Sequence, residues 1–128
     1  LVIAALRPDL ELVMVESRAR RIEWLERARS ALSLANARVE GVRLEHVEPF
    51  IAGVISARAF APLEKLVTLS ARFSTSDTVW LLPKGRSARD ELATLRGWQH
   101  LFHVEQSLTD PEAGVIVGTL KRKAGKRK

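Results

Sequence analysis

The chain has 128 residues, of which 46% are hydrophobic, so we expect a single domain long enough to bury most of its apolar surface. It contains no cysteine, which excludes disulfides, thiolate metal sites and a cysteine nucleophile. No apolar run has the length that crosses a bilayer, and no signal-peptide pattern stands at the start. These two features predict a soluble, cytoplasmic protein with no membrane partner.

The net charge of +6 comes from the end of the chain. Residues 1–120 hold 15 basic and 15 acidic side chains, so this part is formally neutral. We therefore expect a folded body over residues 1–120 and a basic, disordered tail over residues 121–128. Such a tail would bind phosphate backbones by releasing counterions, without reading sequence. The plainer alternative is a terminus that only increases solubility.

The first elements predicted in chain order are a helix end, a strand and a helix. Residues 1–6 are apolar and stop at Arg7-Pro8-Asp9, as the last turns of a buried helix do. Residues 10–15 predict a buried strand. Residues 18–34 predict an amphipathic helix, and Asn36 stands where a residue in the left-handed conformation often follows a helix. The apolar face of this helix comprises Ile22, Leu25, Ala28 and Leu32.

The middle of the chain predicts three strands and a helix. Residues 42–47 alternate with period two, which is typical of a half-exposed or edge strand. A short apolar strand surrounds Val54, and a helix runs from Pro62 to about Phe73, because proline favours the first helical position. Residues 78–82 predict the next buried strand. The inward side chains of the helix are expected to be Leu63, Leu66, Val67 and Phe73.

The last part of the chain predicts a helix and two strands. Ser87 is placed to cap a helix whose first turn holds Asp90 and Glu91, which favour a helix start. Residues 101–104 and 115–120 predict strands that pair as a hairpin or meander. Strands that alternate with amphipathic helices predict an α/β fold with a mostly parallel sheet covered on both faces, here ending in an antiparallel pair. The apolar stripe of the last helix is Ala88, Leu92 and Leu95.

Arg58 follows the strand around Val54 and precedes the helix that opens at Pro62. In open α/β sheets, ligands bind at the carboxyl ends of the strands, so Arg58 stands where a substrate or cofactor would be met. Position without geometry is weak evidence for a site, and the alternative is a solvated loop arginine.

Three other groups carry a candidate role and a plainer alternative. Glu16, just past a strand, suits the hydroxyls of a ribose, or it stabilises the start of a helix. Lys84 precedes Gly85 after a buried strand, where glycine lets a phosphate or base come close, or the pair forms an ordinary turn. Arg20 and Arg21 would bind phosphate on the same face as Glu16, or they form a solvated helix face.

Other chemistry finds little support in the sequence. His100 and His103 are three apart on a predicted strand and face opposite sides, and His46 has no nearby partner, so we expect no metal site. There is no Gly-x-Ser-x-Gly, no phosphate-binding loop and no glycosidase-like carboxylate pair. Core packing is favoured over base stacking for at least Trp80 among the three tryptophans, Trp24, Trp80 and Trp98.

Five segments in order resemble the bacterial 16S ribosomal RNA guanine-N7 methyltransferases (RsmG, formerly GidB), and the resemblance runs over residues 1–120. It implies a Rossmann-like, S-adenosylmethionine-dependent methyltransferase fold. Two segments depart slightly from the family pattern, since Glu16 replaces an aspartate and one extra alanine stands in the Ser-Arg-Ala signature. The segments are Arg7-Pro8, Val15-Glu16-Ser17 with Arg20-Arg21, Asn36 with Arg43-Leu44-Glu45, Val54-Ile55-Ser56-Ala57-Arg58-Ala59, and Pro83-Lys84-Gly85 with Glu91.

The resemblance implies S-adenosylmethionine as the methyl donor and N7 of a guanosine in the 530 loop of 16S rRNA as the acceptor. The partner would be that rRNA or the small ribosomal subunit, and the complete protein would be a monomer. Leu44 and Glu45 would lie beside the adenine of the donor, Glu16 and Ser17 near its ribose, and Arg58 in the shared cofactor and active-site pocket.

The resemblance also implies positioning groups rather than a general base. Guanine N7 carries an in-plane lone pair and no proton, so methyl transfer depends on orientation and electrostatics. Arg58 and Lys84 would act at the catalytic centre by holding the guanine or a neighbouring phosphate. The RNA-binding residues would be Arg20, Arg21, Lys84, Lys121, Arg122 and Lys123.

The main departure from the family is at the start of the chain. The glycine-rich loop, its strand and a helical region are expected before Leu1, and the chain begins within an element, which suggests a fragment. The absent strand would be central, between the strands at Val13 and Val54, so we expect the chain alone to bind the donor poorly. The alternatives are an RNA-binding protein without activity, using the tail and the Arg20–Arg21 face, or an inactive α/β fragment.

Overall fold

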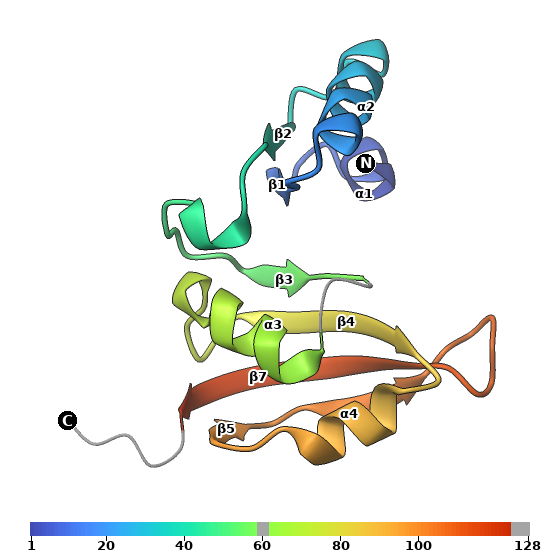
Figure 1. Ribbon diagram of the computed structural model, residues 1–128. Coiled ribbons are helices and arrows are strands. Elements are labelled where there is room, and N and C mark those ends of the chain that lie inside the picture. Colours follow the sequence, from blue (N-terminus) through green and yellow to red (C-terminus); the bar gives the residue numbers. More distant parts are fainter. Residues whose placement is uncertain (59–61, 124–128) are drawn as a thin grey trace. The chain divides into compact units, whose positions relative to one another are not determined.

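The structure is a computed structural model that describes residues 1–58 and 62–123 (Figure 1). The chain divides into two compact units, Leu1–Glu48 and Pro49–Lys128, whereas its length predicted a single domain. No helix within the described ranges is long and apolar enough to cross a membrane. Each unit combines helices with its own sheet, as the alternation of strand and helix patterns predicted.

The first unit is built on two parallel strands joined by a helix. Strand β1 (Leu12–Val15) leads into α2 (Ala19–Ala31), which returns the chain to β2 (Ala37–Glu40). The two strands pair in parallel from Leu12 opposite Ala37 to Val15 opposite Glu40. The short helix α1 (Val2–Leu6) packs on them through Ala4, which is buried with Leu34 and Ala37 against the side chains of Leu1, Leu12 and Met14.

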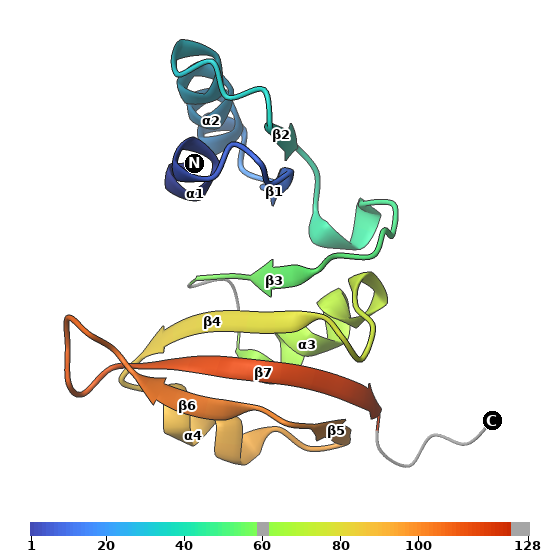
Figure 2. The same cartoon turned by 180° about the vertical axis from the view of Figure 1, so that it is seen from behind.

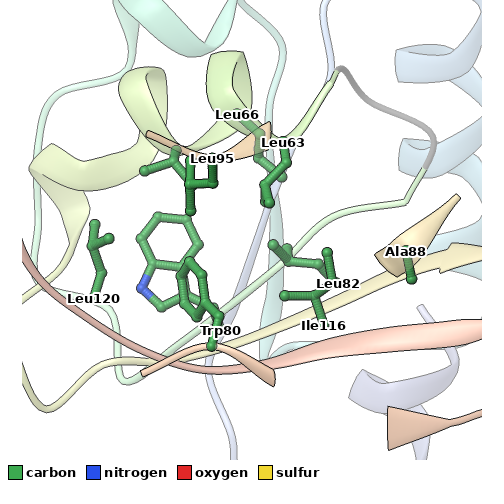
Figure 3. Close-up of a cluster of buried hydrophobic side chains, with 10 residues drawn as sticks. Leu63, Leu66, Trp80, Leu82, Ala88, Leu95, Ile116 and Leu120 are labelled. Carbon is green, nitrogen blue, oxygen red and sulfur yellow. The ribbon is translucent and has the colours of Figure 1, made fainter. Parts of the chain in front are cut away.

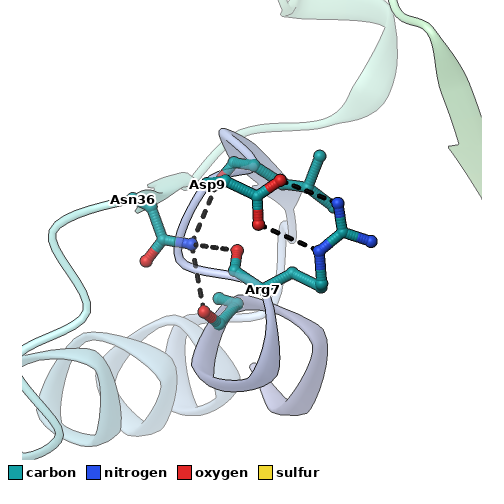
Figure 4. Close-up of polar contacts among 5 residues, drawn as sticks. Arg7, Asp9 and Asn36 are labelled. Carbon is teal, nitrogen blue, oxygen red and sulfur yellow. Dashed lines mark hydrogen bonds and ion pairs between the residues drawn. The ribbon is translucent and has the colours of Figure 1, made fainter.

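Asn36 connects the separate segments of the first unit (Figure 4). Its side-chain amide lies within hydrogen-bond distance of three carbonyl oxygens, at 3.0 Å from Ala4, 3.1 Å from Arg7 and 2.9 Å from Leu10. The prediction of a left-handed Asn36 was wrong, because Ser33, with a φ of 54°, takes that conformation after α2. Asn36 instead uses its amide to hold the end of α1 and the start of β1 together.

The strand predicted at residues 42–47 was also wrong. Strand β2 lies earlier in the chain, and Leu44–His46 form a 3-10 turn, η1. Ala37–Glu40 pair with one edge of β1, and residues 42–47 pair with no strand in the described part of the chain. Alternation alone therefore does not make a strand.

The second unit holds a five-stranded sheet in the order β3-β4-β7-β5, with β6 also paired to β7. Strands β3 and β4 are parallel, while β7 is antiparallel to β4, β5 and β6. The predicted antiparallel pair is therefore confirmed in β6 and β7. The elements are β3 (Val54–Ser56), α3 (Leu63–Ser70), η2 (Ala71–Phe73), β4 (Val79–Gly85), α4 (Ala88–Thr94), β5 (Trp98–His100), β6 (His103–Gln106) and β7 (Gly114–Lys123).

Both helices of the second unit lie on the same face of its sheet (Figures 1 and 2). Trp80 and Leu82 of β4 and Ile116 of β7 point to this face and are completely buried. The predicted inward residues of α3 and η2 are all buried, which confirms that pattern. On the opposite face, Val54, Val79 and Leu81 stay exposed. The core (Figure 3) comprises Leu63, Leu66, Val67, Trp80, Leu82, Ala88, Leu95, Phe102, Ile116 and Leu120.

Strand β7 is longer than predicted and pairs along one edge with two short strands in succession, β6 and β5. It pairs with β6 through Gly114–Val117 and with β5 through residues 120–123, so the chain between β5 and β6 passes over Gly118. Gly118 has a φ of 148°, and a Cβ there would meet the Leu101 carbonyl oxygen and lie 2.8 Å from Phe102 Cα. The predicted body boundary at residue 120 falls within β7, which runs to Lys123, while residues 124–128 of the predicted tail lie outside the described residues.

Candidate functional site

Glu16 stands directly after β1 and is held at the start of α2. Its Oε2 accepts a hydrogen bond of 3.1 Å from the Arg18 N–H, and its Oε1 lies 3.9 Å from Arg21 Nη1. The side chain is 20% exposed. This contact is the helix-start role that we considered as the alternative for Glu16. It fixes the carboxylate at the carboxyl end of β1 and leaves lone pairs that can accept hydroxyl groups.

The segment after β2 meets the same edge of the small sheet. Because β1 and β2 are parallel, their carboxyl ends lie side by side, and the Glu16 N–H donates to the Glu40 carbonyl at 3.1 Å. The chain then passes through Gly41 into η1, which contains Leu44 and Glu45. Leu44 is half-buried and Glu45 is exposed. Each strand of the first unit is therefore followed by an acidic residue, although Glu45 was predicted to lie within a strand.

Arg58 lies two residues beyond β3 and is exposed. It makes no ion pair with any residue in the described ranges. The carboxyl ends of β3 and β4 share one sheet edge, since Ser56 pairs in parallel with Leu81. Ala59 of the Ser-Arg-Ala resemblance lies outside the described residues. The position predicted for Arg58, at the carboxyl end of a parallel strand, is therefore confirmed within the second unit.

Lys84 belongs to a buried polar network rather than to an open turn. It lies inside β4, its side chain is 8% exposed, and its Nζ is 3.1 Å from Glu91 Oε1. The same Oε1 accepts a 2.9 Å hydrogen bond from the Leu63 N–H at the start of α3. Ser87 Oγ lies 2.7 Å from Glu91 Oε2 and 3.0 Å from the Lys84 carbonyl oxygen. One carboxylate therefore ties together β4, α3 and α4.

The electrostatics of this network favour an ionised Glu91. Burial raises the pKa of the Glu91 carboxyl, but hydrogen bonds from Ser87, Lys84 and the Leu63 N–H outweigh that effect and lower it. Ser87 holds the N-cap position of α4, as predicted, although its side chain makes no capping bond and contacts Glu91 instead. Sequence reasoning missed that Glu91 caps the start of α3, because Glu91 and Leu63, whose N–H it accepts, are 28 residues apart in the chain.

The predicted RNA-binding arginines lie on the surface of the first unit. Arg20 and Arg21 are exposed in the first turn of α2, beside an exposed Trp24. Lys121 is exposed within β7. Glu16, Glu45 and these arginines belong to the first unit, and Arg58 and Lys84 to the second. Apart from Lys121, which β7 places at the amino ends of β3 and β4, the predicted site residues therefore form two groups, each at the carboxyl ends of parallel strands.

The other candidate features lie away from these groups. A cavity of about 610 Å³ in the first unit is lined by residues such as Leu10, Asn36 and Arg38, at the amino ends of β1 and β2. In the described part of the chain, no three His, Cys, Asp or Glu side chains cluster as a metal site. His100 instead accepts a 3.1 Å hydrogen bond from the Phe102 N–H through Nδ1, and burial lowers its pKa.

Curated relatives share much of this sequence. A protein of Novosphingobium aromaticivorans is 59% identical over 121 residues, which cover 94% of this chain and 53% of that protein. A protein of Erythrobacter litoralis is 60% identical over 119 residues, which cover 92% of this chain and 58% of that protein. Both are named ribosomal RNA small subunit methyltransferase G. The chain spans about half the length of the curated relatives it matches.

Solved structures, several of them titled methyltransferases, share the fold. A mutant of MtNAS in complex with S-adenosylmethionine has a TM-score of 0.66 at 13% identity, covering 92% of this chain and 49% of that one. An rRNA methylase from Streptococcus thermophilus has a TM-score of 0.60 at 11% identity, covering 93% of this chain and 78% of that one. The chain therefore has a Rossmann-like methyltransferase fold, in incomplete form.

The family model described as rRNA small subunit methyltransferase G (GidB) matches residues 1–110. That range holds all five segments on which the predicted resemblance rested. Its agreement with the named relatives confirms the resemblance, and the chain belongs to the rRNA small subunit methyltransferase G family.

Proposed function

We propose that the chain forms the larger part of the catalytic region of an enzyme that methylates N7 of a guanosine in the 530 loop of 16S rRNA, with S-adenosylmethionine as donor. The small ribosomal subunit would present that rRNA. The observation that carries the proposal is family membership over residues 1–110, joined to acidic and basic groups at the carboxyl ends of parallel strands.

The residues after β1 and β2 fit the nucleoside part of the donor. Glu16 is fixed by the Arg18 N–H, and its remaining lone pairs suit two ribose hydroxyls, with Ser17 exposed beside it. Leu44 is half-buried in η1 and offers an apolar contact for the adenine ring, while Glu45 is an acceptor for its amino group. When bound, the donor supplies an electrophilic methyl group on a sulfonium.

Arg58 fits the acceptor side of the reaction. Its guanidinium is exposed and makes no ion pair within the described ranges, so it is available for the O6 edge of guanine or a nearby phosphate. Lys84 is buried on Glu91, so we assign it a positioning role. Through Glu91 it holds the start of α3, the element that follows Arg58. Transfer to N7 removes no proton, and these groups orient rather than deprotonate.

Donor binding by this chain alone provides a first test. Isothermal titration with S-adenosylmethionine should give no binding or only weak binding, because the glycine-rich loop implied by the family resemblance is not among its residues. Micromolar binding would contradict this expectation. The same titration on the chain joined to the part of the Novosphingobium relative that it does not match should give binding that the Glu16→Ala variant weakens.

Methylation by that joined protein tests the reaction itself. Small subunits that lack the modification and a labelled donor should give label in 16S rRNA, mapped to guanine N7 by cleavage at the modified base. Arg58→Ala should lower the rate more than Arg96→Ala, which removes one exposed arginine elsewhere in the second unit. Label at another base, or none with fully folded protein, would refute the proposal.

A second candidate function is RNA binding without catalysis. The exposed arginines of α2 favour it, because they do not depend on a donor site. It predicts that the joined protein binds RNA but transfers no label, an outcome that separates it from the methyltransferase.

A further inference from the structure

One stripe of α2 combines an exposed aromatic ring with two arginines. Arg20, Trp24 and Arg27 are spaced four and three residues apart, so they lie one turn above another on the same side of the helix. All three are exposed, and Trp24 exposes 57% of its surface. We call these residues the Arg20–Trp24–Arg27 stripe. It is a surface feature, since none of the residues of α2 is buried.

The stripe borders the apolar face of α2. Ile22, Leu25 and Ala28 are the half-buried apolar positions of the helix, and Trp24 is offset by about 100° from Leu25 but lies one turn before Ala28. Within the described ranges, Trp24 makes no aromatic or cation–π contact. More than half of the surface of this residue is therefore left in water between two cations.

The charges on either side of Trp24 indicate what would cover it. Arg20 and Arg27 form no ion pair with residues in the described part of the chain. Of the two acids of α2, Glu26 is paired with Arg29 at 2.9 Å, while Glu23, three residues from Arg20 and four from Arg27, forms no ion pair in the described part of the chain. An apolar protein segment laid over Trp24 would have to desolvate two guanidinium groups without supplying a counter-charge, which is unfavourable.

Single-stranded RNA satisfies all three side chains at once. An unpaired base can stack on the indole, and phosphates on either side can pair with the guanidinium groups. The two arginines are seven positions apart, a rise of roughly 10 Å along the helix, which leaves room for a base between them. Trp24 is the member that distinguishes this surface from a merely basic helix face.

We propose that the Arg20–Trp24–Arg27 stripe is a stacking platform for an unpaired base of RNA. It deepens the proposed function by giving the enzyme a second contact with its rRNA, and the identity of that RNA rests on the proposed function. The stacking contact itself needs neither donor nor methyl transfer. A binding experiment on this chain can therefore fail while the methylation test succeeds, and the reverse.

The affinity of this chain for a short, labelled, single-stranded RNA tests the platform. Trp24→Ala should weaken binding about tenfold, whereas Trp24→Phe, which keeps an aromatic ring, should stay within about threefold of the wild type. Arg20→Gln with Arg27→Gln should reduce the slope of log K against log salt by about 1.4, as expected for two lost phosphate contacts. The matched control, Arg89→Gln with Arg96→Gln, removes the same charge from exposed positions of the second unit.

Fluorescence separates this contact from binding by other basic residues. Trp24 is the most exposed tryptophan, since Trp80 is buried and Trp98 half-buried, so RNA should quench emission in the wild type and much less in Trp24→Phe. Unchanged affinity in Trp24→Ala, or an equal loss of slope in the control, would overturn the proposal. A change in self-association on Trp24→Ala, without a change in RNA affinity, would overturn it in favour of a protein contact.

Discussion

The two units bury their apolar side chains in different ways. The second packs α3 and α4 on a five-stranded sheet and encloses Trp80, Leu82 and Ile116 completely. The buried cluster of the first comprises the smaller set Ala4, Leu34 and Ala37, on a sheet of two strands. A two-stranded sheet is marginal by itself, so the first unit depends more on its polar contacts. The difference predicts that core substitutions and polar substitutions will act on different units.

The largest effect is expected where two segments of the second unit cross. Gly118→Ala should destabilise this unit by at least about 4 kcal/mol, because its φ of 148° suits glycine and the added Cβ would meet the backbone at Leu101 and Phe102. Urea unfolding followed through the buried Trp80 measures it. Gly53→Ala is the matched control, since its Cβ would meet nothing within 4 Å. Equal stability of the two variants would show that the backbone of Leu101 and Phe102 does not pass this close to Gly118.

A pair of leucines compares the two cores directly. Leu82→Ala should lower the free energy of unfolding of the second unit by about 3 kcal/mol, because it leaves a cavity in a fully enclosed core. Leu34→Ala should instead open the first unit alone. In Leu34→Ala, the amides of β1 and β2 should exchange faster, while the amides of β4 and β7 should keep their protection. Loss of protection in both units from Leu34→Ala would mean that they unfold together.

The sequence predicted the elements of the second unit better than those of the first, and the difference in core size explains this. The helices of the second unit carry apolar residues at helical spacing over a large core, so the pattern and the packing agree, as at Leu63 and Leu66. In the first unit, the alternation at residues 42–47 covers more residues than that of β2, yet pairing with β1 selected Ala37–Glu40. Short strands are decided by their partners, which a local pattern does not contain.

Some features of the candidate site could likewise be predicted from the sequence, and others could not. The positions of Glu16 and Arg58 just after β1 and β3 could be predicted, because strand ends are visible in the sequence; their roles remain a proposal. The burial of Lys84 could not, because lysine is seldom buried unless it is paired, and its partner Glu91 is recognised only after α4 packs beside β4. Positions are read from local patterns, whereas pairings need tertiary structure.

The next effect concerns that buried pair. Glu91→Gln should cost the second unit about 2 kcal/mol, since it leaves the Lys84 ammonium without its counter-charge while keeping an acceptor for Leu63. Because the pKa of Glu91 is lowered in the folded state, its contribution is present above its usual pKa of 4.5 and is lost as pH falls through the folded value. Urea unfolding at several pH values should show this acid loss in the wild type and not in Glu91→Gln.

The smallest expected effect tests whether polar contacts hold the first unit. Asn36→Ala removes the amide that joins the carbonyls of Ala4, Arg7 and Leu10, and should cost that unit about 1–2 kcal/mol. Asn36→Asp should cost more at neutral pH, because a carboxylate has no proton to donate and would face three carbonyl oxygens. Hydrogen exchange at the Leu12 amide, which donates to the Asn36 carbonyl, reports the opening. If Asn36→Asp were as stable as the wild type, the amide would not be what joins α1 to β1, and the first unit would rest on Ala4 and Leu34 after all.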